Sequence, residues 1–193
     1  MKIVKVVLLL IVVVVVGVLG LAMTKPNTYH VERSATIAAP PAVVFAQIDD
    51  FHRWAVWSPW EKLDPAMKRT FGGPASGKDA TYAWVGNDKV GEGRMTIVEN
   101  EPDTRIGIKL EFIKPWSSTS QAGFALLPAS DGTKVTWTMD GNYDFMSKVM
   151  CVFTSMDKMI GGDFEKGLAQ LKAVSEATPP AAADTGAVAA PAN

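Results

Sequence analysis

The stretch from Ser147 to Ser175 is the longest amphipathic segment of the chain outside its N-terminus. At about 100° per residue, its apolar side chains fall on one arc and most of its charged side chains on the other. The apolar arc holds Met146, Val149, Met150, Phe153, Met156, Ile160, Phe164, Leu168 and Leu171. The pattern predicts one long helix with a single face to bury, so the rest of the chain must supply a surface that covers it.

The N-terminus carries an uncharged apolar run from Val6 to Met23, preceded by Lys2 and Lys5. This run is long enough to cross a bilayer as a helix, whereas the apolar region of a signal peptide is normally shorter. We therefore expect residues 1–26 to be a membrane anchor and linker that contacts the membrane through residues 3–23. Cleavage near Gly20–Ala22 remains an alternative.

The two lysines place the N-terminus in the cytoplasm by the positive-inside rule, although Lys25 and Arg33 on the other side oppose it. The expected location is a single pass through an inner membrane, with the domain in the periplasm or outside the cell. Residues 178–193 are rich in Ala and Pro and read as a disordered tail. One domain over residues 27–177 remains.

The charged residues are balanced, with 19 Lys and Arg against 20 Asp and Glu, which argues against nucleic-acid binding. A single cysteine, Cys151, excludes an intrachain disulfide, and we expect it to be a packing residue. The only histidines are His30 and His52, and no residue spacing suits a metal site. We expect no metal, no cofactor and no catalytic residue, and we interpret His52 as a solvated turn residue rather than a base.

Short alternating runs separated by turn residues fill the chain between the linker and the amphipathic stretch. The run from Tyr29 to Ile37 predicts a first strand, and Pro41 to Asp49 a short helix that begins with proline. Pro59 interrupts the tryptophan-rich block that follows, so a turn and a second short helix are expected there. Further strands are predicted at 68–71, 80–85, 93–100, 104–113, 119–127 and 134–141. The fold class is therefore α+β, with a curved antiparallel sheet of about seven strands over a long C-terminal helix.

Several motifs carry a family resemblance: Ala39–Phe45, the Trp54–Trp60 block, Phe71–Gly73, Gly91–Gly93, Gly132–Trp137 and Asp163–Leu168. With them, the chain from Tyr29 to Val174 resembles the START-like, helix-grip (SRPBCC) superfamily and, within it, the polyketide cyclase/dehydrase-like proteins of bacteria. The resemblance implies a cavity between the sheet and the C-terminal helix. Lipid carriers, aromatic cyclases, hormone receptors and chaperone cofactors share this fold, so it does not specify a function. No family catalytic residue can be transferred to this chain.

Asp157 is the one carboxylate inside the apolar arc. An unpaired buried charge is costly, so Asp157 needs a partner, water or the surface. One interpretation is a structural carboxylate bonded to Arg94 or to tryptophan N–H groups. The other is a polar contact that orients a ligand in an apolar pocket.

The residues expected to line such a pocket come from the amphipathic stretch, the tryptophan block and the strands. Trp57, Trp60 and Trp116 could instead surround the cavity mouth or touch a membrane, and Gly161–Gly162 permits either a helix bend or close contact with the sheet. The candidates are Asp157, Phe153, Met150, Ile160, Phe164, Trp84, Trp137, Trp57, Trp60, Tyr82 and Arg94.

The leading hypothesis is a membrane-tethered module that binds a small hydrophobic or amphipathic ligand. A cyclase or dehydratase acting in the same cavity, with Asp157, His52 or Tyr82 as proton shuttle, is the first alternative. A protein-interaction module of the cell envelope is the second.

Overall fold

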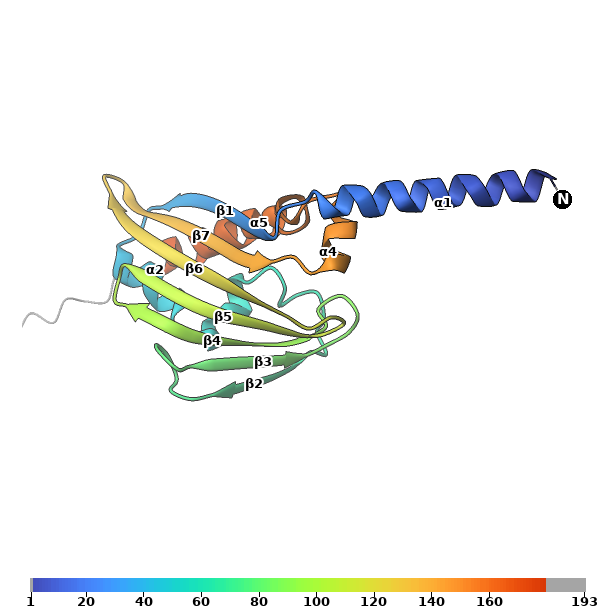
Figure 1. Ribbon diagram of the computed structural model, residues 1–193. Coiled ribbons are helices and arrows are strands. Elements are labelled where there is room, and N and C mark those ends of the chain that lie inside the picture. Colours follow the sequence, from blue (N-terminus) through green and yellow to red (C-terminus); the bar gives the residue numbers. More distant parts are fainter. Residues whose placement is uncertain (1, 180–193) are drawn as a thin grey trace, which may run out of the picture.

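The structure is a computed structural model that describes residues 2–179, so most of the expected tail lies outside the described residues. Seven antiparallel strands form one curved sheet in the order β1-β7-β6-β5-β4-β3-β2 (Figure 1). Every predicted strand is present, with ends that differ from the prediction by at most two residues. The strands are β1 (Thr28–Ile37), β2 (Lys68–Gly72), β3 (Thr81–Val85), β4 (Glu92–Glu101), β5 (Arg105–Lys114), β6 (Ser118–Ala129) and β7 (Gly132–Asn142).

Alternation along β1 and β3–β7 decides which face is buried, whereas every residue of β2 is exposed. In β5, Ile106 and Ile108 are fully buried on the concave face, while Arg105 is exposed. The β6–β7 turn depends on Gly132, whose φ of 134° suits glycine. A Cβ at this position would lie 2.1 Å from the backbone oxygen of Ile37, so the turn can pack against the end of β1 only with glycine.

The helices cover the concave face of the sheet. After β1 come α2 (Pro41–Ile48), which begins with the predicted proline, a 3-10 turn (Phe51–Arg53) and α3 (Trp54–Trp57). The C-terminal helix α5 (Met156–Ala177) packs along β1, and its buried side chains Phe164, Leu168 and Leu171 belong to the core. Its hydrophobic stripe is thus covered as the sequence predicts.

The prediction of one helix from 147 to 175 is wrong, because the chain forms two helices there. A short helix, α4 (Phe145–Met150), is capped by Asp144, and residues 151–155 leave the helical path. Ser155 then caps α5, its side chain accepting a hydrogen bond from the Lys158 backbone N–H at 3.2 Å. Serine before a first-turn carboxylate, here Asp157, is a helix-start signal, and the apolar periodicity that continues across the break obscures it.

Helix α1 (Lys2–Met23) extends away from the domain (Figure 1). Its apolar side chains are almost all exposed, and the segment Ile3–Met23 has a mean hydropathy of 3.3. Among residues 2–179 it is the one helix long and apolar enough to cross a membrane. This helix is compatible with a single-pass anchor or with a signal sequence.

Candidate functional site

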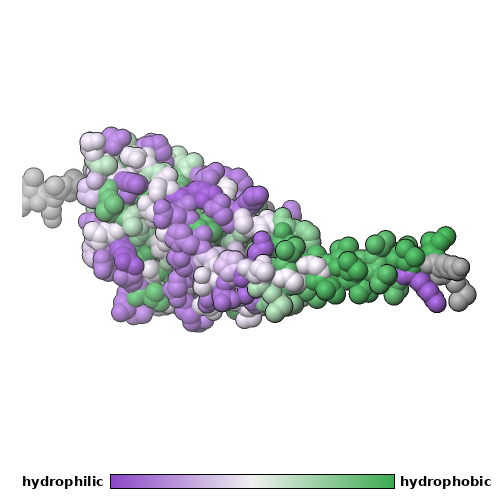
Figure 2. Space-filling model, turned by 45° about the horizontal axis from the view of Figure 1, so that its top comes forward, coloured by the Kyte–Doolittle hydropathy of each residue, from purple (hydrophilic) through white to green (hydrophobic). Residues whose placement is uncertain are grey.

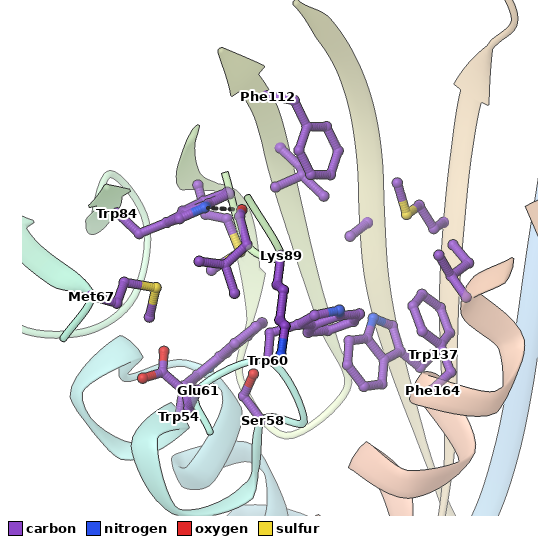
Figure 3. A pocket seen from close by; sticks show the side chains of 16 residues that line it. Trp54, Ser58, Trp60, Glu61, Met67, Trp84, Lys89, Phe112, Trp137 and Phe164 are labelled. Carbon is purple, nitrogen blue, oxygen red and sulfur yellow. Dashed lines mark hydrogen bonds between the residues drawn. The ribbon is translucent and has the colours of Figure 1, made fainter. Parts of the chain in front are cut away.

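A cavity of about 230 Å³ lies between the concave face of the sheet, the turn after α3 and the start of α5 (Figure 3). Most of its lining is aromatic or aliphatic, and one carboxylate and one amine, Glu61 and Lys89, are among the lining residues that the structure describes. The lining consists of Trp54, Ser58, Trp60, Glu61, Met67, Trp84, Lys89, Val90, Met95, Leu110, Phe112, Ala122, Trp137, Met139, Ile160 and Phe164.

One wall of the cavity is an aromatic stack centred on Trp137. Its ring lies between Phe164, at 4.2 Å and 10°, and Phe124, at 4.8 Å and 29°. Trp60 meets Trp137 edge-on at 5.7 Å. The stack needs glycine at 167, because a Cβ there would lie 2.6 Å from Cζ3 of Trp137. Close approach of α5 to β7 therefore fixes the orientation of this wall.

The indole N–H of Trp137 has no hydrogen-bond partner among residues 2–179, although the side chain is only 2% exposed. The neighbouring tryptophans differ: Trp54 donates to the Ile48 oxygen, Trp57 to the Gln47 oxygen and Trp84 to the Val90 oxygen. A buried donor without a partner costs about 1–3 kcal/mol. Trp137 thus lines an apolar cavity and carries a buried donor that no other group in the described part of the chain satisfies.

The carboxylate of Glu61 lies at the cavity edge and is held by two donors. Its side chain is 7% exposed. Arg69 Nε donates to Oε2 and the Tyr82 hydroxyl donates to Oε1, both at 2.6 Å. Burial, together with the adjacent Glu61, raises the pKa of Tyr82. Sequence reasoning missed Glu61, since a single glutamate after Trp60 carries no pattern of its own.

Five of the eleven sequence-predicted site residues line the cavity, namely Trp60, Trp84, Trp137, Ile160 and Phe164. Tyr82 is buried behind the lining and contacts it through Glu61. Trp57 does not surround the cavity mouth: it lies in α3, where it is fully buried and packs edge-on against Trp137 at 5.8 Å. Trp57 thus packs against Phe124 and Trp137 of the aromatic stack without lining the cavity.

The other four candidates lie outside the cavity. The Asp157 side chain is 52% exposed and pairs with Arg33 of β1, with Oδ1 at 2.7 Å from Nη1. The Arg33 guanidinium lowers the pKa of Asp157. Arg94, its expected partner, pairs with Glu111 at 3.1 Å. Met150 and Phe153 are exposed. The break before α5 changes the helical phase, so residues on one side of it no longer share an arc with residues on the other.

The remaining chemical candidates are also separate from the cavity lining. His52 Nδ1 donates a hydrogen bond to Asp50 Oδ1 at 2.8 Å, and its ring stacks on Phe71. Cys151 is buried, as expected for a packing residue. Within residues 2–179, no group of three or more His, Cys, Asp or Glu side chains is placed to hold a metal ion.

The sequence model of the family "Polyketide cyclase / dehydrase and lipid transport" matches residues 28–176. The chain belongs to this family. The match covers the whole sheet and nearly all of α5, and it leaves out α1. The helix-grip fold and the resemblance found in the sequence are thereby confirmed. No curated protein matches the sequence closely enough to count as a relative.

Solved structures share the fold at low identity. A protein of Chromobacterium violaceum is 18% identical, with a TM-score of 0.55 over 79% of this chain and 100% of its own. The di-domain ARO/CYC protein StfQ of the steffimycin biosynthetic pathway is 10% identical, with a TM-score of 0.57 over 78% of this chain and 51% of its own. Major latex-like protein 151 of Panax ginseng is 9% identical, with a TM-score of 0.56 over 78% and 99%. These likenesses concern the fold alone.

Proposed function

We propose that the chain binds a small hydrophobic or amphipathic ligand in the cavity between the sheet and α5. The observation that carries this proposal is an apolar cavity whose wall contains one buried donor without a partner, Trp137. Ligand sites are typically apolar with a few polar groups that orient the ligand. The family, described by its model as including lipid transport, supports the same reading.

The size of the cavity limits what it accommodates. An apolar cavity of about 150 Å³ holds benzene, and sites for drug-sized ligands begin at about 300 Å³. At about 230 Å³, the cavity fits one fused ring system or one hydrocarbon chain of a larger molecule. The Trp137 donor favours a ligand with a carbonyl, hydroxyl or ether oxygen on the buried part.

Binding is better supported than catalysis because the acidic group at the cavity is already engaged. Glu61 accepts short hydrogen bonds from Arg69 and Tyr82. The raised pKa of Tyr82 makes its phenol a poor proton donor near neutral pH. Asp157 and His52, the other candidate shuttles, lie outside the cavity lining.

We further propose that α1 tethers the domain to an inner membrane, with the N-terminus in the cytoplasm and the domain in the periplasm. The length of α1 and the lysines before its apolar run support this arrangement. Protease added to spheroplasts should digest the domain and leave a membrane fragment near the mass of α1. Full protection of the domain would contradict the orientation, and a mature chain that lacks residues 1–22 would contradict the tether.

The test of binding is native mass spectrometry of the full chain released from detergent. Ala122 lines the cavity on β6, whereas Ala125 of the same strand is exposed on the outer face. The wild type and Ala125→Phe should carry a bound small molecule, and Ala122→Phe should lose it because the new ring fills the cavity. Equal occupancy in the two variants, or an empty wild type after exposure to lipid extracts, would overturn the proposal.

A further inference from the structure

The pairing of the strands brings five connections to one end of the sheet, which we call the anchor end, and one of them is the loop into β2, because Lys68 pairs with Val85. Val85 of β3 pairs with Glu92 of β4, and Phe112 of β5 pairs with Ser118 of β6, so both turns lie there. Thr28 at the start of β1 pairs with Asn142 at the end of β7. Only residues 24–27 separate β1 from α1, so α1 meets the domain at this end (Figure 1).

An exposed apolar surface is located at the same end. Helix α4 follows β7 directly and contacts α1. On α4, the turn after it and the first turn of α5, five large side chains are exposed, with Phe153 at 76%. We call them the α4 patch: Phe145, Met146, Met150, Phe153 and Met159. Figure 2 shows that hydrophobic surface continues from α1 onto the adjoining end of the domain.

An apolar patch of this kind marks an interaction site, and its surroundings indicate the partner. The patch adjoins α1, whose apolar side chains require a lipid environment. Lys25, Lys148 and Lys158 lie beside it, as expected for a surface that meets lipid headgroups. The nearby carboxylates are engaged, since Asp144 caps α4 and Asp157 pairs with Arg33. A lipid surface therefore fits the patch better than a polar protein surface.

The cavity opens toward the same end. Its deep lining, including Trp54, Met95 and Trp137, is buried. Its partly or fully exposed lining residues come from the β3–β4 turn, the second half of β5, β6, the turn after α3 and the start of α5. These residues are Trp60, Glu61, Lys89, Val90, Leu110, Phe112, Ala122 and Ile160. Ile160 follows Met159 of the α4 patch, so the start of α5 contributes to both the mouth and the patch.

We propose that the α4 patch lies in the surface of the bilayer that α1 crosses, and that the cavity takes up a membrane-resident amphipathic lipid through a mouth placed against that bilayer. This inference rests on the proposed binding function and names the source of the ligand. Tethering alone allows the domain to tumble above the membrane, whereas insertion of the patch fixes the mouth at the headgroup level. A ligand then enters the cavity without crossing water.

Docking is tested with the full chain in vesicles of phosphatidylglycerol and acyl-brominated phosphatidylcholine. The dye bimane is attached at position 153 or 127 in Cys151→Ser/Phe153→Cys and Cys151→Ser/Leu127→Cys. Leu127 is 59% exposed but lies near the β6–β7 turn, at the end opposite the anchor end. Bromine should quench the dye at 153 and not at 127. Equal quenching at the two positions, or a dye at 153 that reports only self-association of two chains, would overturn the proposal.

Uptake is tested with cis-parinaric acid, a single-chain probe added in vesicles and followed by energy transfer from tryptophan. Met146→Asp/Phe153→Asp should slow the uptake about tenfold or more, because burial of one phenylalanine is equivalent to at least a factor of ten in the docked population. Leu127→Asp should match the wild type. The double variant should still bind the probe in detergent solution. Wild-type uptake that the double variant retains refutes the inference alone, whereas a wild type without binding in either medium refutes the proposed function.

Discussion

At the residue scale, Trp137 combines the structural and the functional part of the site. It stacks on Phe124 and Phe164 while its N–H has no partner. The sequence singled out this tryptophan as one of several aromatic residues. It could not indicate that the other core indoles would find backbone oxygens and that this one would not, because that difference depends on where β7 meets α5.

Trp137→Phe should separate the two roles of this side chain. Phenylalanine keeps an aromatic ring in the stack but removes the donor, so a ligand that accepts a hydrogen bond should lose about tenfold in affinity, the effect of roughly 1–1.5 kcal/mol. Calorimetry with 2-acetylnaphthalene, and with 2-ethylnaphthalene as the matched hydrocarbon, measures this directly. An equal change for both probes would show that Trp137 contributes only shape.

The contact between Asp157 and Arg33 differs from the one that the sequence predicts for Asp157. The sequence predicts Asp157 among apolar neighbours, with Arg94 or a ligand as its partner. It pairs instead with Arg33, which lies two residues after the buried Val31 and therefore on the inner face of β1. Arg33 also binds Glu165 at 2.7 Å. An arginine on the inner face of an edge strand accounts for a carboxylate near the hydrophobic stripe of α5 without any ligand.

At the element scale, α5 is held to β1 by close approach as well as by charge. A Cβ at Gly161 would lie 2.2 Å from Nη2 of Arg33, whereas a Cβ at Gly162 would have nothing within 4 Å. Of the two sequence interpretations of this glycine pair, close contact with the sheet is the one supported at Gly161. Arg33 can therefore keep this position against α5 only if residue 161 has no side chain.

Gly161→Ala and Gly162→Ala form a matched pair. Both gain about 1 kcal/mol of helix propensity, but only the first displaces Arg33 from its two carboxylates. Gly162→Ala should leave the melting temperature unchanged or raise it, and Gly161→Ala should lower it relative to Gly162→Ala, as measured by circular dichroism in detergent. A Gly161→Ala variant as stable as Gly162→Ala would show that the Arg33 contact contributes nothing.

Acid should weaken the attachment of α5 to β1. The pKa values of Asp157, beside Arg33, and of Glu176, beside Lys172 and the Ala38 N–H, are lower in the folded chain than their ordinary values. The contribution of these two carboxylates to folding stability is therefore complete above their unfolded pKa values of about 4. It is lost as pH falls through their lowered pKa values in the folded chain. Asp157→Asn should make the decline in melting temperature between about pH 5 and pH 2 shallower than in the wild type. An unchanged decline would assign the acid sensitivity to other groups.

At the scale of the whole molecule, the sequence specified the fold more completely than the site. Alternation and turn residues define strands locally, so the seven strands and their antiparallel hairpins follow from short-range patterns, whereas the pairing of β1 with β7 joins distant segments that no local pattern links. The cavity depends on sheet curvature and on distant pairs such as Glu61 with Arg69 and Tyr82, which no local pattern contains. Four of the six aromatic lining residues were predicted because they stand out by type, whereas Trp54 and Phe112 were not. Met67, Lys89 and Ala122 were missed because they do not stand out by type.

Occupancy of the cavity beside Trp137 by a ligand is the core of the proposed function. It is tested most directly by ¹⁹F NMR of the full chain labelled with 5-fluorotryptophan and titrated with 2-acetylnaphthalene in detergent. Trp54, Trp60, Trp84 and Trp137 line the cavity, and Trp116, exposed in the β5–β6 turn, serves as the internal control. A ligand in the cavity should produce saturable shifts of the four cavity resonances and leave Trp116 unmoved. Shifts confined to Trp116, or no saturable shift at all, would contradict the proposed function.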